Sequence, residues 1–172
     1  MASGLRVLFG GVWDPATVSA AALAGPGAVL DRGIGAALDD RYARAVEGSW
    51  RVEDVILDGG QPVEALLSGR GVHVNVRSTR KAFTRNDDPG YPGTLSGPDR
   101  MSIRGYDVVV VKNGYLFPAQ TDDSASHFLA VTPGGTDLNA DRLRFTALSR
   151  PMYPWDTGFE PELSPRVVPP FR

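Results

Sequence analysis

The chain has 172 residues, a length typical of a single domain. Its 18 basic and 20 acidic residues give a net charge of −2, which argues against a general nucleic-acid binder because such proteins need a basic face. It has no cysteine, and this excludes disulfides, cysteine-ligated metal sites and cysteine nucleophiles. The 20 glycines and 14 prolines favour a turn-rich, strand-rich domain over a helical bundle.

No targeting or membrane-spanning segment is recognisable in the sequence. The first residues lack an apolar core with a small-residue cleavage site behind it. The longest apolar runs are far shorter than the roughly 20 residues that a spanning helix needs. We therefore expect a cytoplasmic protein that has neither a membrane nor a nucleic acid as partner.

The first predicted elements are a strand over residues 5–12 and a helix directly after it. Asp14 is a typical N-cap, Pro15 suits the first helical position, and Gly25 ends the helix. A strand followed by a short turn and a helix opens an α/β unit. We expect a mixed, strand-rich α/β fold with few short helices and an extended proline-rich C-terminal tail.

The next predicted elements are strands separated by glycine-rich turns. Residues 25–35 contain four glycines. This stretch forms either a phosphate-binding loop or a strand between two turns, and the spacing of its glycines fits no known phosphate-binding motif. Strands are predicted at 50–57 and 72–76, interrupted by Gly59, Gly60 and Pro62.

The second of these strands alternates valines with polar residues, which predicts one solvent-exposed face. The basic run at 77–84 that follows it either holds an anion or a carboxylate, or is a solvated strand end. Residues 87–98 read as a loop.

The clearest predicted strand covers residues 106–111 and contains four consecutive valines. Such a run is typical of a central strand covered on both faces. Lys112, Asn113 and Gly114 follow it directly, and in open α/β sheets ligands bind just beyond the carboxyl ends of strands. These residues form either a ligand-binding turn or an ordinary solvent-facing one.

The sequence presents no self-sufficient active site. His73 and His127 are 54 positions apart, both in predicted strands (the second at 127–131), and neither belongs to a metal-binding motif. Asp122 and Asp123 either start a helix or hold a cation. We predict no catalytic residue and no metal ligand in this chain. A domain at 1–149 would carry a Pro/aromatic-rich tail, residues 150–172, packed on its surface.

Several stretches, taken in order, resemble the motifs of one known family. They are VWDPATV at 12–18, VNVRSTR at 74–80, YDVVVVKNGYLF at 106–117, and VTPG at 131–134 followed by RPMYPWD at 150–156. The family is the MlrC-like (microcystinase C) metallopeptidase group, and the resemblance is to its C-terminal domain. The family's glycine-rich start, Asp-Asn-Pro-Gly-Gly-Gly, has no counterpart, so we expect that segment of the domain to be missing.

The resemblance implies a hydrolase whose zinc ligands lie on a separate N-terminal domain, while the C-terminal domain covers the substrate cleft. It implies an accessory role for this chain, without a cofactor of its own, and a partner that is either such a metal-binding half or a second copy. The residues expected to contact substrate are Lys112, Asn113 and Tyr115, which follow the valine strand.

This sequence departs from the family pattern at two places. Asn113 replaces the family's serine and Leu116 stands where a histidine is expected, and the family's Gly-Gly-Lys segment is GIGAA at 33–37. The alternative interpretation is therefore a non-catalytic binding module derived from this domain, and a truncated product without a role is a third.

Overall fold

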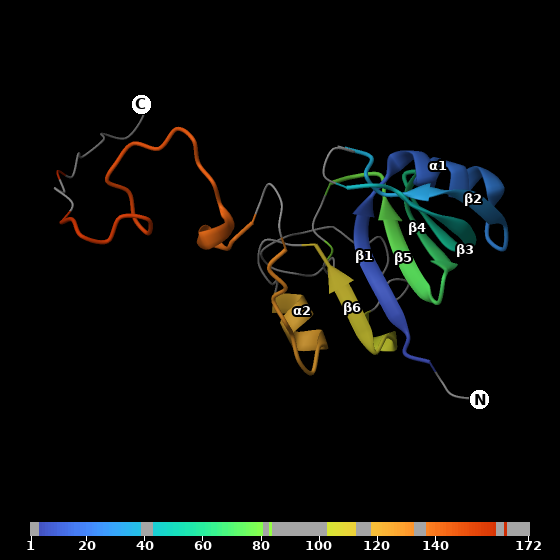
Figure 1. The fold of residues 1–172 in the computed structure, drawn as a ribbon. Helices are drawn as coiled ribbons and strands as arrows, with labels where there is room; N and C mark the ends of the chain where they lie inside the picture. Colours follow the sequence, from blue (N-terminus) through green and yellow to red (C-terminus); the bar gives the residue numbers. More distant parts are fainter. Residues whose placement is uncertain are drawn as a thin grey trace, which may run out of the picture. The chain divides into compact units, whose positions relative to one another are not determined.

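The computed structural model describes residues 4–38, 43–80, 83, 103–112, 118–132, 137–160 and 164. The chain divides into two compact units, Met1–Phe128 and Leu129–Arg172 (Figure 1). The predicted loop at 87–98, together with Asn113 and Tyr115, lies outside the described residues. The predicted boundary after residue 149, and the packing of the tail, remain predictions.

The first unit is built on one mixed sheet of six strands in the order β2-β3-β4-β5-β1-β6 (Figure 1). The strands are β1 (Val7–Trp13), β2 (Val29–Ile34), β3 (Val46–Asp58), β4 (Gln61–Gly69), β5 (Val72–Arg77) and β6 (Val108–Val111). Neighbours from β2 to β5 pair antiparallel, whereas β1 pairs parallel with both β5 and β6. Two short helices, α1 (Pro15–Ala24) and α2 (Pro118–Asp123), complete the unit. The predicted strand-rich α/β fold is confirmed.

Helix α1 forms where the sequence predicts it. The carboxylate of Asp14 accepts hydrogen bonds from the backbone N–H and the hydroxyl of Thr17, at 3.0 and 2.8 Å. The same carboxylate accepts from the N–H of Gly35 at 3.2 Å, and the N–H of Asp14 donates to the carbonyl of Arg77 at 3.0 Å. Asp14 therefore caps the helix and also fixes its start to the ends of β2 and β5.

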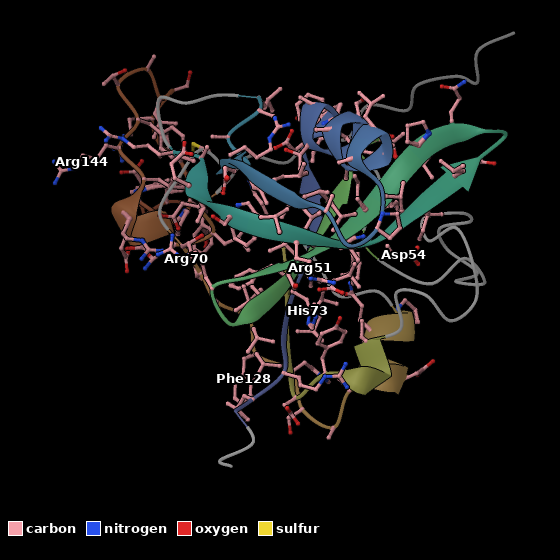
Figure 2. All side chains as sticks on the ribbon, turned by 90° about the vertical axis from the view of Figure 1, so that its right-hand side faces the viewer. Arg51, Asp54, Arg70, His73, Phe128 and Arg144 are labelled. Atoms are coloured by element: carbon pink, nitrogen blue, oxygen red, sulfur yellow. The ribbon has the colours of Figure 1, made fainter. Side chains whose placement is uncertain are left out.

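Each face of the sheet carries its own apolar cluster. On the face covered by α1, buried side chains come from the helix and from β2 to β5: Val18, Ala21, Ile34, Trp50, Val52, Ala65, Leu67, Val74 and Val76. On the opposite face the buried cluster is Leu8, Ile56 and Phe83, with Leu66, Val109 and Val111 among the side chains packed around it. Arg51, Asp54 and His73 lie on this opposite face, away from α1 (Figure 2).

Strand β4 is an element that the sequence analysis missed. Pro62 looks like an interruption in the sequence, but it is the second residue of β4 and pairs with Leu57 at an irregularity of the ladder. Proline is tolerated near the start of a strand and at bulges because a ladder hydrogen bond is absent there. The apparent interruption is thus a tight turn at Gly59 and Gly60 between two long strands.

The predicted solvent-exposed face of β5 is wrong at its carboxyl end. Asn75 and Arg77 are buried, with relative exposures of 0% and 2%. Arg77 is therefore not part of a solvated strand end. The alternation in the sequence correctly indicated two faces, but the second face is also buried here, where Asn75 and Arg77 contact Glu64 of β4.

The predicted central position of the valine strand is also wrong. Among the described residues β6 is the edge strand beside β1, and Val108 and Val110 are 41% and 43% exposed. Its other face, at Val109 and Val111, packs into the second cluster as predicted for a core strand. A run of valines indicates a strand but does not specify its place in a sheet.

The described residues bear on several further expectations. Residues 127–131 form no strand, and Asp122 and Asp123 end α2 instead of starting a helix. The glycine-rich stretch at 25–35 contains a turn and β2, so the strand alternative is confirmed. No helix in the described ranges is long and apolar enough to cross a membrane.

The second unit is held by short-range polar contacts. Arg142 donates two hydrogen bonds to Asp137, at 2.8 and 2.9 Å, and closes a turn that also uses the N–H of Asn139. Arg150 and Asp156 pair at 2.6 Å across the motif RPMYPWD, and Asp156 also accepts from the N–H of Met152. The motif is therefore a closed turn whose first and last residues are joined by an ion pair.

Candidate functional site

The carboxyl ends of the three parallel strands meet at one edge of the sheet. Strands β5, β1 and β6 lie side by side and end at Arg77, Trp13 and Val111. From β1 the chain leads through α1 to β2 at the far end of the sheet, whereas α2 lies on the other side of β6 (Figure 1). An edge where the connections of neighbouring strands leave in opposite directions is where open α/β sheets bind ligands.

Lys112 is the predicted site residue that the structure describes. It directly follows β6, at the level of Gly11, because Gly10 pairs with Val111. Its side chain is exposed, and no described acidic residue pairs with its ammonium group. The structure thus leaves a lysine available to an anionic group at the position that the sequence analysis selected.

A bulge in β1 shapes the middle of this edge. The pairing of β1 with β5 shifts between Phe9 and Val12, and Gly11 has a φ of 77°, which favours glycine. Phe83 packs directly against this segment, since a Cβ on Gly10 would lie 2.6 Å from its ring. The carbonyl of Phe83 accepts a hydrogen bond from Gln120 of α2 at 2.6 Å. Two glycines therefore let the chain after β5 lie against β1 and contact α2.

A buried network of hydrogen bonds holds the bulge of β1 in place. The side-chain oxygen of Asn75 accepts from the N–H of Gly11 at 3.1 Å, and its amide nitrogen donates to Oε2 of Glu64 at 3.1 Å. Arg77 donates to Oε1 of Glu64 through Nε at 3.1 Å and through Nη2 at 2.7 Å. Glu64 is 1% exposed, so a desolvated ion pair fixes the ends of β4, β5 and β1 together.

Burial dominates the electrostatics of this pair. Loss of water raises the pKa of Glu64, and the Arg77 charge and the hydrogen bonds from Asn75 and Arg77 offset this only in part. Burial likewise lowers the pKa of Arg77, against the opposing effect of Glu64. The charges of Glu64 and Arg77 interact with each other inside the protein. We therefore interpret the pair as a structural feature that holds the strand ends in place, and not as a group that binds a ligand.

Beside the buried pair, Trp13 and Arg80 form a second, exposed feature of the edge. The indole N–H of Trp13 donates to the carbonyl of Ser78 at 3.2 Å, and the Arg80 guanidinium lies 5.9 Å from the centre of the indole ring. The hydroxyl of Ser78 donates to the carbonyl of Val63 at 3.2 Å. Within the basic run at 77–84, these contacts hold Arg80 against the domain and leave its charge toward solvent.

The described residues do not fit a metal centre of the kind that the resemblance places on a partner domain. They contain no group of three or more His, Asp or Glu side chains that could hold an ion. The His73 ring packs edge-on against Tyr106, at 5.4 Å between centroids, and the exposed His127 lies far along the chain from it.

Sequence reasoning missed Glu64 and the hydrogen bonds that it accepts from Asn75 and Arg77. Glu64 lies on β4, which was not predicted, and it precedes Arg77 by 13 residues, so no local spacing relates the two. The available signal was the acidic residue inside an apolar run, Val63 to Leu67, because a carboxylate in such a run requires a buried partner.

Comparison with known proteins identifies relatives of this domain. The family described as "MlrC C-terminus" matches residues 1–147. A crystal structure from Mesorhizobium sp. BNC1, described as a "Putative metallopeptidase", superposes with a TM-score of 0.61 at 22% identity, over 90% of this chain and 32% of that protein. This chain thus spans about a third of that protein's length, and the likeness shows a shared fold. No protein with a curated description matches. Because the family match covers most of the chain, the protein belongs to the family of MlrC C-terminal domains.

Proposed function

We propose that this chain is the accessory, substrate-cleft domain of an MlrC-like, metal-dependent peptidase or amidohydrolase that acts in the cytoplasm. The observation that carries the proposal is the position of Lys112 at the carboxyl edge of the parallel strands, exposed and without an acidic partner among the described residues. The family match and the shared fold with one third of a "Putative metallopeptidase" support it.

The proposed role of Lys112 follows from its chemistry. An ammonium group at a strand end can bind a substrate carboxylate or polarise a carbonyl oxygen on which negative charge develops. Asn113 and Tyr115 follow in the sequence, and we include their amide and hydroxyl groups as further hydrogen-bonding partners of the substrate. The buried Glu64–Arg77 pair keeps the neighbouring strand ends in place.

The proposal assigns the zinc ion to a separate domain or chain, since the described residues lack a suitable group of ligands. When bound there, zinc would supply Lewis acidity or an activated water. This chain would contribute substrate positioning. Alone, it is expected to bind no stoichiometric zinc and to hydrolyse no peptide.

One observation favours the alternative, a non-catalytic binding module. Phe9, Val108 and Val110 expose 40%, 41% and 43% of their surface on neighbouring strands, which is typical of a surface that another molecule covers. In that case the partner would be a protein, either a metal-free one or a second copy of this chain.

The test is affinity purification of the tagged chain coupled to metal analysis and a peptide-hydrolysis assay. We expect zinc and hydrolysis only in the complex with a metal-bearing partner, and we expect Lys112→Met to lower kcat/KM by about 100-fold. Arg70→Met, at the turn between β4 and β5 on the opposite edge (Figure 2), is the matched control and should retain activity. One tightly bound zinc per isolated chain would contradict the proposal, and a stable complex without zinc or hydrolysis would favour the binding module.

A further inference from the structure

Helix α1 packs against four of the six strands on its own face of the sheet and leaves most of β1 and β6 uncovered. It packs against β2, β3, β4 and β5, whereas β1 and β6 extend beyond it. Among the described residues, this bare region is an apolar strip formed by Phe9 of β1 with Val108 and Val110 of β6. Leu5, two residues before β1, is also exposed, at 67%.

The strip is continuous because its residues share one face. Phe9 pairs with Val110, and Val7 pairs with Val108, so side chains at these positions point to the same side of the sheet. Val109 and Val111 alternate with them and pack into the cluster on the opposite face. The alternation of exposed and half-buried residues along β6 continues to Lys112, which is exposed.

Such a face is unusual for parallel strands. Strands paired in parallel normally have both faces covered, whereas in the described part of the chain β1 and β6 have one covered face and one exposed one. The bare apolar surface therefore fits a molecule that removes it from water. The positive charge of Lys112, at the carboxyl end of the strip, indicates which chemical group that molecule should carry.

Lys112 defines the charge of the molecule that would cover the strip. It stands at the carboxyl end of the strip, and no described acidic residue is paired with it. Asp14, the acidic residue that directly follows β1, is buried and used by the start of α1 and by Gly35. A ligand with apolar side chains and one carboxylate at its end would complement both parts of the surface.

We propose that the apolar strip and Lys112 together bind the end of a peptide, with apolar side chains on Phe9, Val108 and Val110 and a free terminal carboxylate on Lys112. This inference rests on the proposed function, because it specifies the class of substrate that the cleft domain receives. It assigns to Lys112 the role of carboxylate binding. The peptide is recognised by this chain without help from a metal.

The experiment is a titration of the full chain, labelled on valine methyl groups, with acetyl-Leu-Leu as the free acid and as the C-terminal amide. We expect saturable shifts at Val108 and Val110 with the acid, and about tenfold weaker binding of the amide, because a charge-assisted hydrogen bond is lost. Lys112→Met should weaken the acid to the level of the amide, whereas Arg70→Met should leave both affinities unchanged.

A second variant separates the apolar part of the surface from the charge. Val110→Thr keeps the shape and strand propensity of the residue but replaces a methyl group by a hydroxyl. This variant should weaken the binding of the acid and of the amide by the same factor, about threefold, because apolar contact is lost in both complexes.

Two results would overturn the inference: equal binding of acid and amide, or shifts that do not saturate or that map away from the strip. The measurement needs no partner and no metal, so its outcome is independent of the hydrolysis assay. Peptide binding without reconstituted hydrolysis would refute the proposed function alone. Hydrolysis that depends on Lys112 without peptide binding at the strip would refute this inference alone.

Discussion

The buried pair of Glu64 and Arg77 allows a stability prediction that depends on pH. Replacing Arg77 by methionine keeps the volume of the side chain but removes the only charge known to face the Glu64 carboxylate among the described residues. It deletes the two described hydrogen bonds from Arg77 to Glu64, at 3.1 and 2.7 Å. Bonds to charged groups contribute about 1.5–3 kcal/mol each, and breaking a buried pair costs about 3–5 kcal/mol. We therefore expect Arg77→Met to lower the free energy of unfolding by about 3–5 kcal/mol.

The sign of the pH dependence follows from the Glu64 carboxyl. Burial already raises its pKa, and Arg77 opposes that shift, so the variant raises the pKa further. A raised pKa in the folded state gives stability that is present below the ordinary value and is lost as the pH rises through the raised value. The variant should thus be much less stable at pH 8 than at pH 5, whereas the wild-type protein should show a shallower decline in the same direction.

The assay is urea unfolding followed by far-ultraviolet circular dichroism at both pH values. With a slope of about 2 kcal/mol per molar urea, the expected loss moves the midpoint by about 2 M. The control is the double variant Glu64→Gln with Arg77→Met, which removes both charges and leaves an amide oxygen for Asn75. It should recover most of the stability and lose the pH dependence, because replacing a whole buried pair is close to neutral. A loss below about 1 kcal/mol at pH 8 in the single variant would refute the argument.

Three further predictions concern other parts of the molecule. Asp14→Ala should cost about 1–2 kcal/mol of stability and should speed amide exchange in the first turn of α1, because the cap is lost. Gly10→Ala should destabilise by about 1–3 kcal/mol in chemical denaturation, since its Cβ would meet the Phe83 ring at 2.6 Å, whereas Gly4→Ala, with nothing within 4 Å, should be neutral. Hydrogen bonds from an arginine hold the pKa of Asp137 below its ordinary value, so the turn they close should persist above that value and open as the pH falls through the lowered one, as followed by amide chemical shifts.

The opening of the fold could be predicted because its signals are local. Asp14, Pro15 and Gly25 act within one turn of the helix that they delimit, and the cap bond joins residues three positions apart. The same holds for the position of Lys112, which depends on where β6 ends and not on what lies beside it. The family resemblance carried by these stretches was likewise confirmed by the match over residues 1–147.

The features that were missed depend on contacts between distant residues. Arg77 faces a carboxylate and not water because Glu64 lies opposite it on β4. This strand is hard to recognise in the sequence because it contains Pro62. Whether four valines form a central or an edge strand is decided by the order of the whole sheet. The alternation of residues in the sequence indicates that a strand has two faces. Whether each face contacts water, another part of the protein or a ligand depends on tertiary packing.

In this domain, the residues that stabilise the carboxyl ends of the parallel strands differ from Lys112, the residue proposed to bind the ligand. The Glu64–Arg77 pair and Asn75 hold the strand ends through buried bonds, so changes there act on stability before they act on binding. Lys112 is exposed and forms none of these bonds, and substitutions at such positions usually change stability by less than about 0.5 kcal/mol. A loss of peptide binding in Lys112→Met can therefore be attributed to the missing ammonium group. The same loss in Arg77→Met would have to be corrected for the fraction of unfolded protein.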